Sequence, residues 1–203
     1  MNDMKLVLLV LIMITFFSSC STSNQEKALI KNNYNNEQQT LQSCEASSFT
    51  DQFSFPTGLN GYFDLDEGIK CSKIVSKPCL IYFSAFSSVE SRKVEMNLLL
   101  NKEIQSFINN EFVFVSLIKD AKMRLPKKYQ VISNLKKDTI QLYGEKSKYQ
   151  QESKFKSNEH PAFYIIGSNE KILTKPYFYD LSIPLFKQFL NEGVLKYEKL
   201  LKE

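Results

Sequence analysis

The sequence predicts an α/β domain in which a central sheet is flanked by helices. Two apolar runs, residues 79–84 and 112–118, have the length and composition of strands that are buried on both faces. Between them, residues 88–108 carry apolar side chains at helical spacing. Another helix is predicted before the first run. The order helix, strand, helix, strand favours a parallel pair of strands with right-handed crossovers.

The composition is that of a globular protein, because the 203 residues are 43% hydrophobic and 24% charged. This length allows one ordinary domain plus an attached segment. The formal net charge is +4 and charges of both signs are interspersed, so we expect no nucleic-acid partner. A single His and the absence of any Cys-x-x-Cys motif argue against a metal centre, and we expect neither a metal nor another cofactor.

Residues 1–19 have the pattern of a signal peptide. Lys5 supplies a basic start, and the apolar run 6–17 is as long as a signal-peptide core but short for a spanning helix. The small residues before Cys20 resemble a bacterial lipobox. In such signals the Cys thiol is diacylated and the chain is cut before it, which implies a mature lipoprotein that begins at Cys20. A plain signal peptide or an N-terminal anchor helix is the alternative.

Each of these readings places the domain outside the cytoplasm, where disulfides persist. We therefore expect a protein of the bacterial cell envelope, held to a membrane by lipid on its periplasmic side. Residues 20–50 are rich in Ser, Asn and Gln and are too polar to offset the entropy of ordering the chain. They are predicted to form a flexible tether that spans on the order of 30 Å. The folded domain is predicted to occupy residues 51–203.

The domain is predicted to open with an edge strand at residues 53–55, which Pro56 stops. A helix then begins after Asp64, which forms a capping box with Glu67, and ends near residue 75. The buried strand 79–84 follows it.

The next helix is predicted to run unbroken from residue 88 to residue 108. Ser87 and Glu90 have the S-x-x-E spacing of a capping box at its start, and Asn109 and Asn110 close it. The strand 112–118 follows.

Residues 119–158 form a lysine-rich insertion, in which short helical pieces are predicted at 127–135 and 146–155. A strand at 161–167 comes next, and after a tight turn residues 171–174 are predicted to pair back against it.

The chain ends in an amphipathic helix over residues 182–202. Seven apolar side chains are predicted to face the core: Leu185, Phe186, Phe189, Leu190, Val194, Tyr197 and Leu201.

Five separated stretches of this pattern resemble the C-terminal thioredoxin-like domain of bacterial transmembrane thiol:disulfide interchange proteins. The stretches, in chain order, are residues 62–67, 77–83, 91–95, 112–117 and 158–164. For example, residues 91–95 read Ser-Arg-Lys-Val-Glu where that family has Cys-Arg-Lys-Met-Glu. The resemblance implies a thioredoxin-like fold, with a central mixed sheet flanked by helices and a helical insertion before the strand that follows a cis-proline.

The family's redox motif is absent. Its Cys-x-x-Cys is replaced by Ser88-Val89-Glu90-Ser91, and the position of the buried acid of thioredoxins is occupied by Tyr82. A serine hydroxyl is not ionised near neutral pH and forms no disulfide, whereas a thiol at a helix N-terminus becomes a competent thiolate. We therefore expect no thiol–disulfide catalysis at these positions.

The resemblance also implies that Pro161 is cis and that the neighbouring backbone pairs with an extended peptide. The predicted binding groove comprises Ser88, Val89, Glu90, His160 and Pro161. His160 is alternatively a solvated loop residue. The hypothesis is a redox-inactive module that binds an envelope protein or an extended peptide. Serine hydrolysis by Ser88 with His160 is a weaker alternative, because the sequence places no acid behind His160 and no elbow glycines around Ser88.

Three further cysteines remain once Cys20 is assigned to lipid. Cys79 opens a buried strand and is predicted to be an inert small hydrophobe. A disulfide between Cys44 and Cys71 would staple the tether to the fold, although the sequence does not give the distance between them. The same two cysteines carry the alternative function, a thiol:disulfide oxidoreductase of the envelope that uses non-standard cysteines.

Overall fold

A computed structural model describes Cys44 and residues 47–56, 58–134 and 137–202. The predicted signal peptide, Cys20 and most of the predicted tether lie outside these residues. Within the part of the chain that is described, no helix is both long and apolar enough to cross a membrane.

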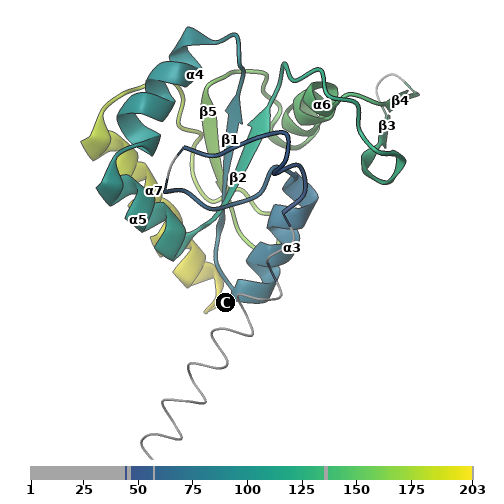
Figure 1. Ribbon diagram of the computed structural model, residues 1–203. Coiled ribbons are helices and arrows are strands. Elements are labelled where there is room, and N and C mark those ends of the chain that lie inside the picture. The colour runs from purple at the N-terminus through teal and green to yellow at the C-terminus, as the bar shows by residue number, and fades with distance from the viewer. Residues whose placement is uncertain (1–43, 45–46, 57, 135–136, 203) are drawn as a thin grey trace, which may run out of the picture. The chain divides into compact units, whose positions relative to one another are not determined.

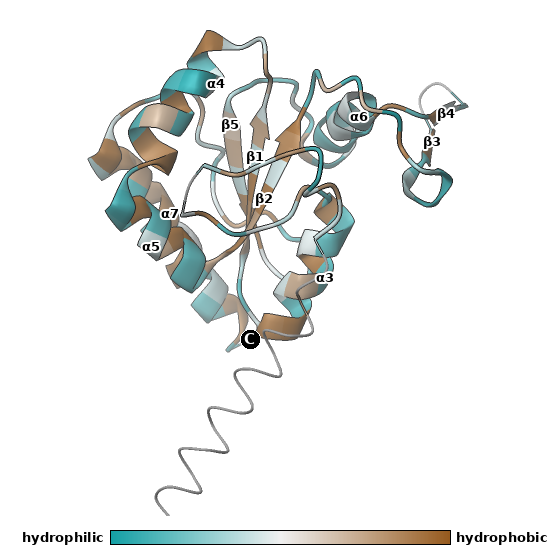
Figure 2. Ribbon diagram, viewed as in Figure 1, coloured by the Kyte–Doolittle hydropathy of each residue, from teal (hydrophilic) through white to brown (hydrophobic). Residues whose placement is uncertain are grey.

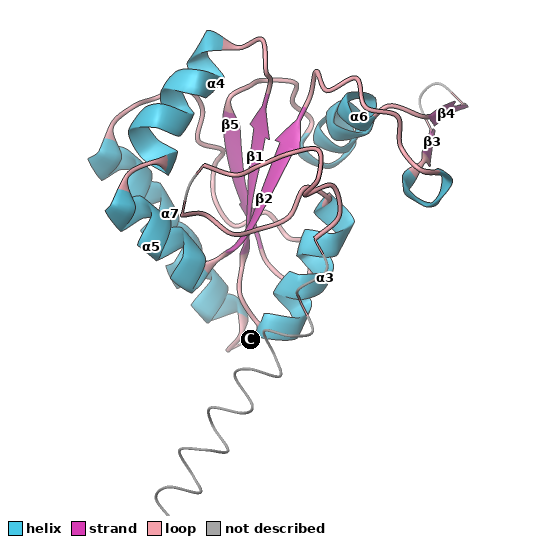
Figure 3. Cartoon of the chain, in the orientation of Figure 1, coloured by secondary structure: helices cyan, strands magenta, loops and turns pink. Residues whose placement is uncertain are grey.

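Three strands form the central sheet in the order β2-β1-β5 (Figures 1 and 3). The central strand β1, Cys79–Ser84, pairs in parallel with β2, Val113–Ile118, and antiparallel with β5, Ala162–Ile166. All six residues of β1 are buried, as their apolar character predicts. The predicted mixed sheet flanked by helices is confirmed.

The two faces of β1 contact two different cores because successive side chains of a strand point to opposite sides. Leu80 and Tyr82 belong to one cluster, together with residues from the long helical segment and the C-terminal helix. Ile81 and Phe83 belong to the other, together with residues of the first helix. Figure 2 shows that the strands are mostly hydrophobic, whereas the helices carry both hydrophobic and hydrophilic residues. The helices are α3 (Leu65–Val75), α4 (Val89–Val94), a π-helix (Glu95–Leu99), α5 (Lys102–Glu111), α6 (Tyr143–Phe155) and α7 (Ile183–Leu200).

The prediction of one continuous helix over 88–108 is wrong. The α-helical pattern ends at Val94, gives way to the π-helix, and starts again after Asn101, whose backbone is extended. The Asn101 side chain accepts hydrogen bonds from the N–H groups of Glu103 and Ile104 at 3.0 and 3.1 Å. Asn competes with a helix by forming such local bonds, so it caps a new helix where apolar periodicity suggested continuation.

The predicted helical piece at 127–135 is also wrong. A short 3-10 turn, Lys127–Tyr129, leads into a hairpin of β3, Val131–Ser133, and β4, Asp138–Ile140. β-branched residues at these positions favour strands over helix. Residues 53–55 form no strand. Instead the Phe55 ring stacks on Phe63 with ring centres 4.0 Å apart.

The last predicted elements are found with local differences. Residues 171–174 were predicted to pair back against β5, and Ile172 forms an isolated antiparallel bridge with Ile166 of this strand. In α7 the Phe186, Leu190 and Tyr197 side chains are buried, and the Phe189 side chain lies with them. Leu185 and Leu201 are exposed, contrary to prediction, because they lie in the first turn and beyond the last helical residue, respectively.

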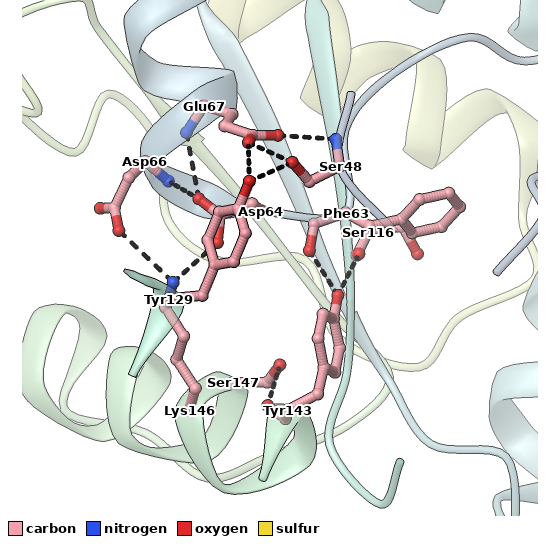
Figure 4. Close-up of polar contacts among 10 residues, drawn as sticks. All are labelled: Ser48, Phe63, Asp64, Asp66, Glu67, Ser116, Tyr129, Tyr143, Lys146 and Ser147. Carbon is pink, nitrogen blue, oxygen red and sulfur yellow. Dashed lines mark hydrogen bonds and ion pairs between the residues drawn. The ribbon is translucent and has the colours of Figure 1, made fainter. Parts of the chain in front are cut away.

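The predicted tether does not extend to residue 50. Ser48 donates its N–H to the Glu67 carboxylate at 2.9 Å (Figure 4). The Phe49 ring packs edge-on against Tyr129. Cys44 is joined to Cys71 of α3 by a disulfide, with Cα atoms 5.4 Å apart. The folded domain therefore begins before residue 51.

Asp64 caps α3 as predicted, but the capping box is not closed. Its carboxylate accepts hydrogen bonds from the N–H groups of Asp66 and Glu67 at 3.0 and 3.2 Å. The Glu67 carboxylate turns to Ser48 instead of the Asp64 N–H.

Asp64 also forms a buried ion pair with Lys146 of α6, at 2.7 Å (Figure 4). The two side chains are only 4% and 6% exposed. Tyr143 of the same helix donates its hydroxyl to the Phe63 carbonyl at 2.5 Å. These bonds fasten the insertion to the start of α3.

We expect Lys146→Met to lower the free energy of unfolding by about 3 kcal/mol, because the Asp64 carboxylate would stay buried without its ionic partner. Urea unfolding at neutral pH measures the loss. Lys196→Met is the matched control, since Lys196 pairs with Glu192 at 2.6 Å but both side chains are about half exposed. Its effect should stay under about 0.5 kcal/mol. Equal losses in the two variants would contradict a stabilising role for the buried pair.

Candidate functional site

The candidate site lies where the carboxyl ends of β1 and β2 meet the start of β5. Phe83 of β1 pairs with Ala162 of β5, so Pro161 lies level with the end of β1. The turn of residues 85–88 leaves β1 at this same edge. The fold thus brings the predicted groove residues Ser88, Val89 and Glu90 to the edge of the sheet that also carries His160 and Pro161.

Ser88, and not Ser87 as predicted, is the N-cap of α4. Its Oγ accepts a hydrogen bond from the Ser91 N–H at 3.1 Å and donates to the Glu90 carboxylate at 3.2 Å. Ser87 instead donates its N–H to Asp120. The predicted S-x-x-E capping box is therefore not formed, because α4 begins one residue later than predicted and Glu90 lies only two residues after the N-cap.

Ser91 is fully buried, and its Oγ accepts a hydrogen bond from the Ala85 N–H at 3.3 Å. Ser88 and Ser91, the two serines that were predicted to replace a redox pair, therefore hold the turn and the helix together. A hydroxyl is sufficient for this work, since only hydrogen-bonding capacity is used.

Tyr82 lies buried beneath the helix. Its hydroxyl donates to the Ser91 carbonyl at 3.3 Å, and its ring stacks on Phe163 with centres 4.5 Å apart. Burial, with a smaller effect of the Glu95 charge, raises the pKa of Tyr82 far above its ordinary value. The hydroxyl therefore stays protonated and cannot act as the proton-accepting carboxylate whose position it occupies.

Asp120, directly after β2, fixes the turn that follows β1. Its carboxylate accepts hydrogen bonds from the N–H groups of Phe86 and Ser87 at 2.7 and 2.8 Å. Partial burial acts in the opposite direction, but the bonds from Ser87 and Phe86 hold the pKa of Asp120 below its ordinary value. These two N–H groups of the turn are therefore bound by the Asp120 carboxylate and do not need an anion from outside the chain.

Lys119, the preceding residue, fixes the loop before β5. Its buried Nζ donates to the carbonyl and the side-chain oxygen of Asn158 at 2.6 and 2.7 Å and lies 3.4 Å from His160 Nδ1. The His160–Pro161 peptide bond is cis. Among the described residues, the His160 ring contacts Lys119 and forms no hydrogen bond with Ser88. The geometry therefore provides no serine–histidine pair for hydrolysis.

Sequence reasoning missed Lys119 and Asp120. The available signal was their position, because polar residues that directly follow a parallel strand lie at the edge where such sheets place their sites.

The cysteines lie away from this edge. Cys44 and Cys71 form the disulfide on α3, whereas Cys79 is a free thiol at the opposite end of β1. Burial raises the pKa of the Cys79 thiol, which disfavours the reactive thiolate.

Two solved structures are similar to this chain. One, described as "DsbH Oxidoreductase", has 15% sequence identity, covers 71% of this chain and 92% of its own, and has a TM-score of 0.51. The other, a thioredoxin from Thermus thermophilus, has 12% identity, covers 70% and 91%, and has a TM-score of 0.50. No protein-family model matches the chain, and no curated protein matches it. The chain has the thioredoxin-like fold, as its sequence predicts.

We expect Lys119 to make stability depend on pH. Burial, with a smaller effect of Lys148, lowers its pKa to about 8, below the ordinary 10.5, against the opposing charges of Glu152 and Glu159. Between these values the unfolded chain binds more protons than the folded chain, so the free energy of unfolding rises with pH.

Urea unfolding at about pH 7.5 and about pH 9.5 tests this expectation. The native chain should gain on the order of 1 to 2 kcal/mol relative to Lys119→Met over this interval. The exposed Lys122→Met variant should follow the native chain. Parallel stability curves for the native chain and Lys119→Met would show that Lys119 titrates normally.

Proposed function

We propose that this protein is a lipid-anchored, thioredoxin-like module of a bacterial cell envelope, which binds an extended peptide segment of another envelope protein. The proposal includes no thiol exchange at Ser88 and Ser91. The observation that carries it is the use of both hydroxyls in the cap and turn of α4. The positions that would do redox chemistry thus serve the fold.

The surface around these serines supports recognition. Phe86 and Val89 are 53% and 62% exposed, and the His160 side chain is exposed on the adjoining loop. Exposed apolar side chains that cluster beside a polar loop are typical of a protein-binding surface. Burying them against a partner would supply binding energy.

The same site is held rigidly before any partner binds. Asp120 fixes the turn that carries Phe86, and Lys119 fixes the loop that carries His160. A preorganised surface loses little conformational entropy on binding, so a short peptide segment is a sufficient ligand.

A second candidate function uses the Cys44–Cys71 disulfide as a redox pair. The bond itself favours this candidate, since a disulfide is the oxidised form of such a pair. However, Cys71 lies within α3 and is buried, away from the helix N-terminus that activates thiols in this fold. We therefore assign the disulfide a structural role, as a staple between the N-terminal segment and α3.

Site-specific photo-crosslinking distinguishes the two functions. A benzophenone amino acid at Val89 should crosslink a discrete envelope protein, whereas the same group at Leu195, a 65% exposed position on α7, should not. Phe86→Asp should reduce the crosslink at least about tenfold, because it removes an apolar contact from the surface.

The Cys44→Ser, Cys71→Ser double variant tests whether the disulfide takes part in the function. Non-covalent recognition at Val89 predicts an unchanged crosslink, provided that circular dichroism shows a folded domain. Loss of the crosslink in the folded double variant would favour the disulfide as the working group. Identical crosslinks at Val89 and Leu195 would overturn the peptide groove.

The lipid anchor rests on the apolar run 6–17 and on Cys20 after two small residues. We expect the chain, made in a bacterium, to incorporate an alkyne-labelled palmitate and to partition into the detergent phase of Triton X-114. Cys20→Ser should abolish both properties, and Cys79→Ser should change neither. Labelling that survives in Cys20→Ser would refute lipidation at this residue.

A further inference from the structure

A cavity of about 360 Å³ lies beside the helical segment that follows the candidate site. Its walls come from residues 54–56, from the face of β1 and β2, and from residues 92–100. The Phe55 ring in this segment approaches Phe114 of β2, with ring centres 5.7 Å apart. The volume falls within the range of sites that bind small organic molecules.

Most of the wall is apolar. Phe55, Phe114 and Leu99 line the interior, and the exposed side chains of Phe86, Met96 and Leu100 form the rim. Met96 is 69% exposed, and a flexible thioether at a rim adapts to ligands of different shape. A ligand that fills this cavity must therefore have an apolar chain or ring.

The polar part of the wall contains an incompletely paired guanidinium. Arg92 donates Nη2 to the Glu95 carboxylate at 2.6 Å, whereas its Nε is shielded from solvent and has no hydrogen-bond partner among the described residues. The Arg92 side chain as a whole is 42% exposed, so its guanidinium can be reached from the cavity. A guanidinium in this position can bind an anionic oxygen from outside the chain through charge-assisted hydrogen bonds.

Glu95 is the carboxylate that pairs with Arg92 at the cavity wall, at 2.6 Å. Burial raises the pKa of Glu95, although the Arg92 charge and a hydrogen bond from Tyr82 act in the opposite direction. Arg92 and Glu95 are the charged side chains among the described residues that line the cavity. An anion therefore finds a donor there, whereas a cation would meet Arg92 and a carboxylate that is already engaged.

The backbone that carries these side chains departs from α-helical geometry. The π-helix Glu95–Leu99 directs Glu95, Met96 and Leu99 to the cavity wall. Single π-helical turns within α-helices occur frequently at functional sites.

We propose that this cavity binds a small amphiphilic anion, with its apolar chain or ring against Phe55, Phe114 and Leu99 and its carboxylate or sulfonate on Arg92. The cavity shares the Phe86 side chain with the proposed peptide-binding surface. The anion proposal rests on Arg92 and the apolar wall, so it does not depend on the peptide function.

The chain contains no Trp, so one introduced Trp reports on the cavity alone. We would titrate the full chain carrying Cys20→Ser and Met96→Trp with sodium decanoate and follow the Trp emission. Binding should shift the emission to shorter wavelength and saturate. The same titration of Leu195→Trp, at a similarly exposed position on α7, should give no saturable shift.

Three variants in the Met96→Trp background test the role of Arg92. Arg92→Met should weaken decanoate binding at least about tenfold, because a charge-assisted hydrogen bond is lost. Lys93→Met removes an equal charge from the neighbouring exposed residue and should leave the affinity unchanged. Glu95→Gln should tighten binding, because it frees Arg92 from its internal competitor. Such a gain cannot arise from misfolding.

Decan-1-ol has the same alkyl chain without the charge. It should bind more weakly than decanoate to the Met96→Trp protein that keeps Arg92. In the Arg92→Met variant of that protein, decan-1-ol should bind with the same weak affinity. Equal affinity of Arg92→Met and the native background for decanoate would overturn the proposal. So would a saturable shift of the same size in Leu195→Trp, or a weaker affinity in Glu95→Gln.

Discussion

Two consecutive residues at the end of β2 hold the candidate site together. Lys119 reaches the loop before β5 through Asn158 and His160, and Asp120 reaches the turn after β1 through the N–H groups of Phe86 and Ser87. The Lys119 N–H also donates to the Ser84 carbonyl at 2.8 Å, which extends the pairing of β1 and β2 by one step. One short segment thus fixes both loops relative to the sheet.

This segment is itself supported from the insertion. A Cβ on Gly144, at the start of α6, would lie 2.6 Å from the Lys119 carbonyl oxygen and 2.8 Å from that of Ala121. Only glycine allows the helix to approach the backbone this closely. The same helix carries Lys146, whose buried ion pair with Asp64 ties it to α3. The insertion therefore stabilises the segment that carries Lys119 and Asp120.

Ser88 and Ser91 are used by the fold itself. Ser88 caps α4, Ser91 closes the turn onto Ala85, and Tyr82 fills the space beneath them. Each group is satisfied by a neighbour within the fold, so none is left as a reactive nucleophile or base. The surface above them and the cavity beside them remain available for binding.

The α/β arrangement could be predicted from the sequence because strand and helix periodicities are local, and the resemblance of five stretches implied the thioredoxin-like form of it. The buried run of β1, the cap at Asp64 and the amphipathic face of α7 all follow from the spacing of residues along the chain. The predictions made from the sequence failed where the interaction partner of a side chain lies far away along the chain. The Glu67 carboxylate, for example, binds Ser48 instead of the N–H of its own helix cap. Asn101 is a different case, because it starts a new helix through local hydrogen bonds from Glu103 and Ile104 that the apolar periodicity did not indicate. Contacts between distant segments placed Lys119 and Asp120 beneath two loops and joined Cys44 to Cys71. They also left Arg92 Nε without a hydrogen-bond partner within the described part of the chain. These features depend on which segments meet in space, and the spacing of residues along the chain does not carry that information.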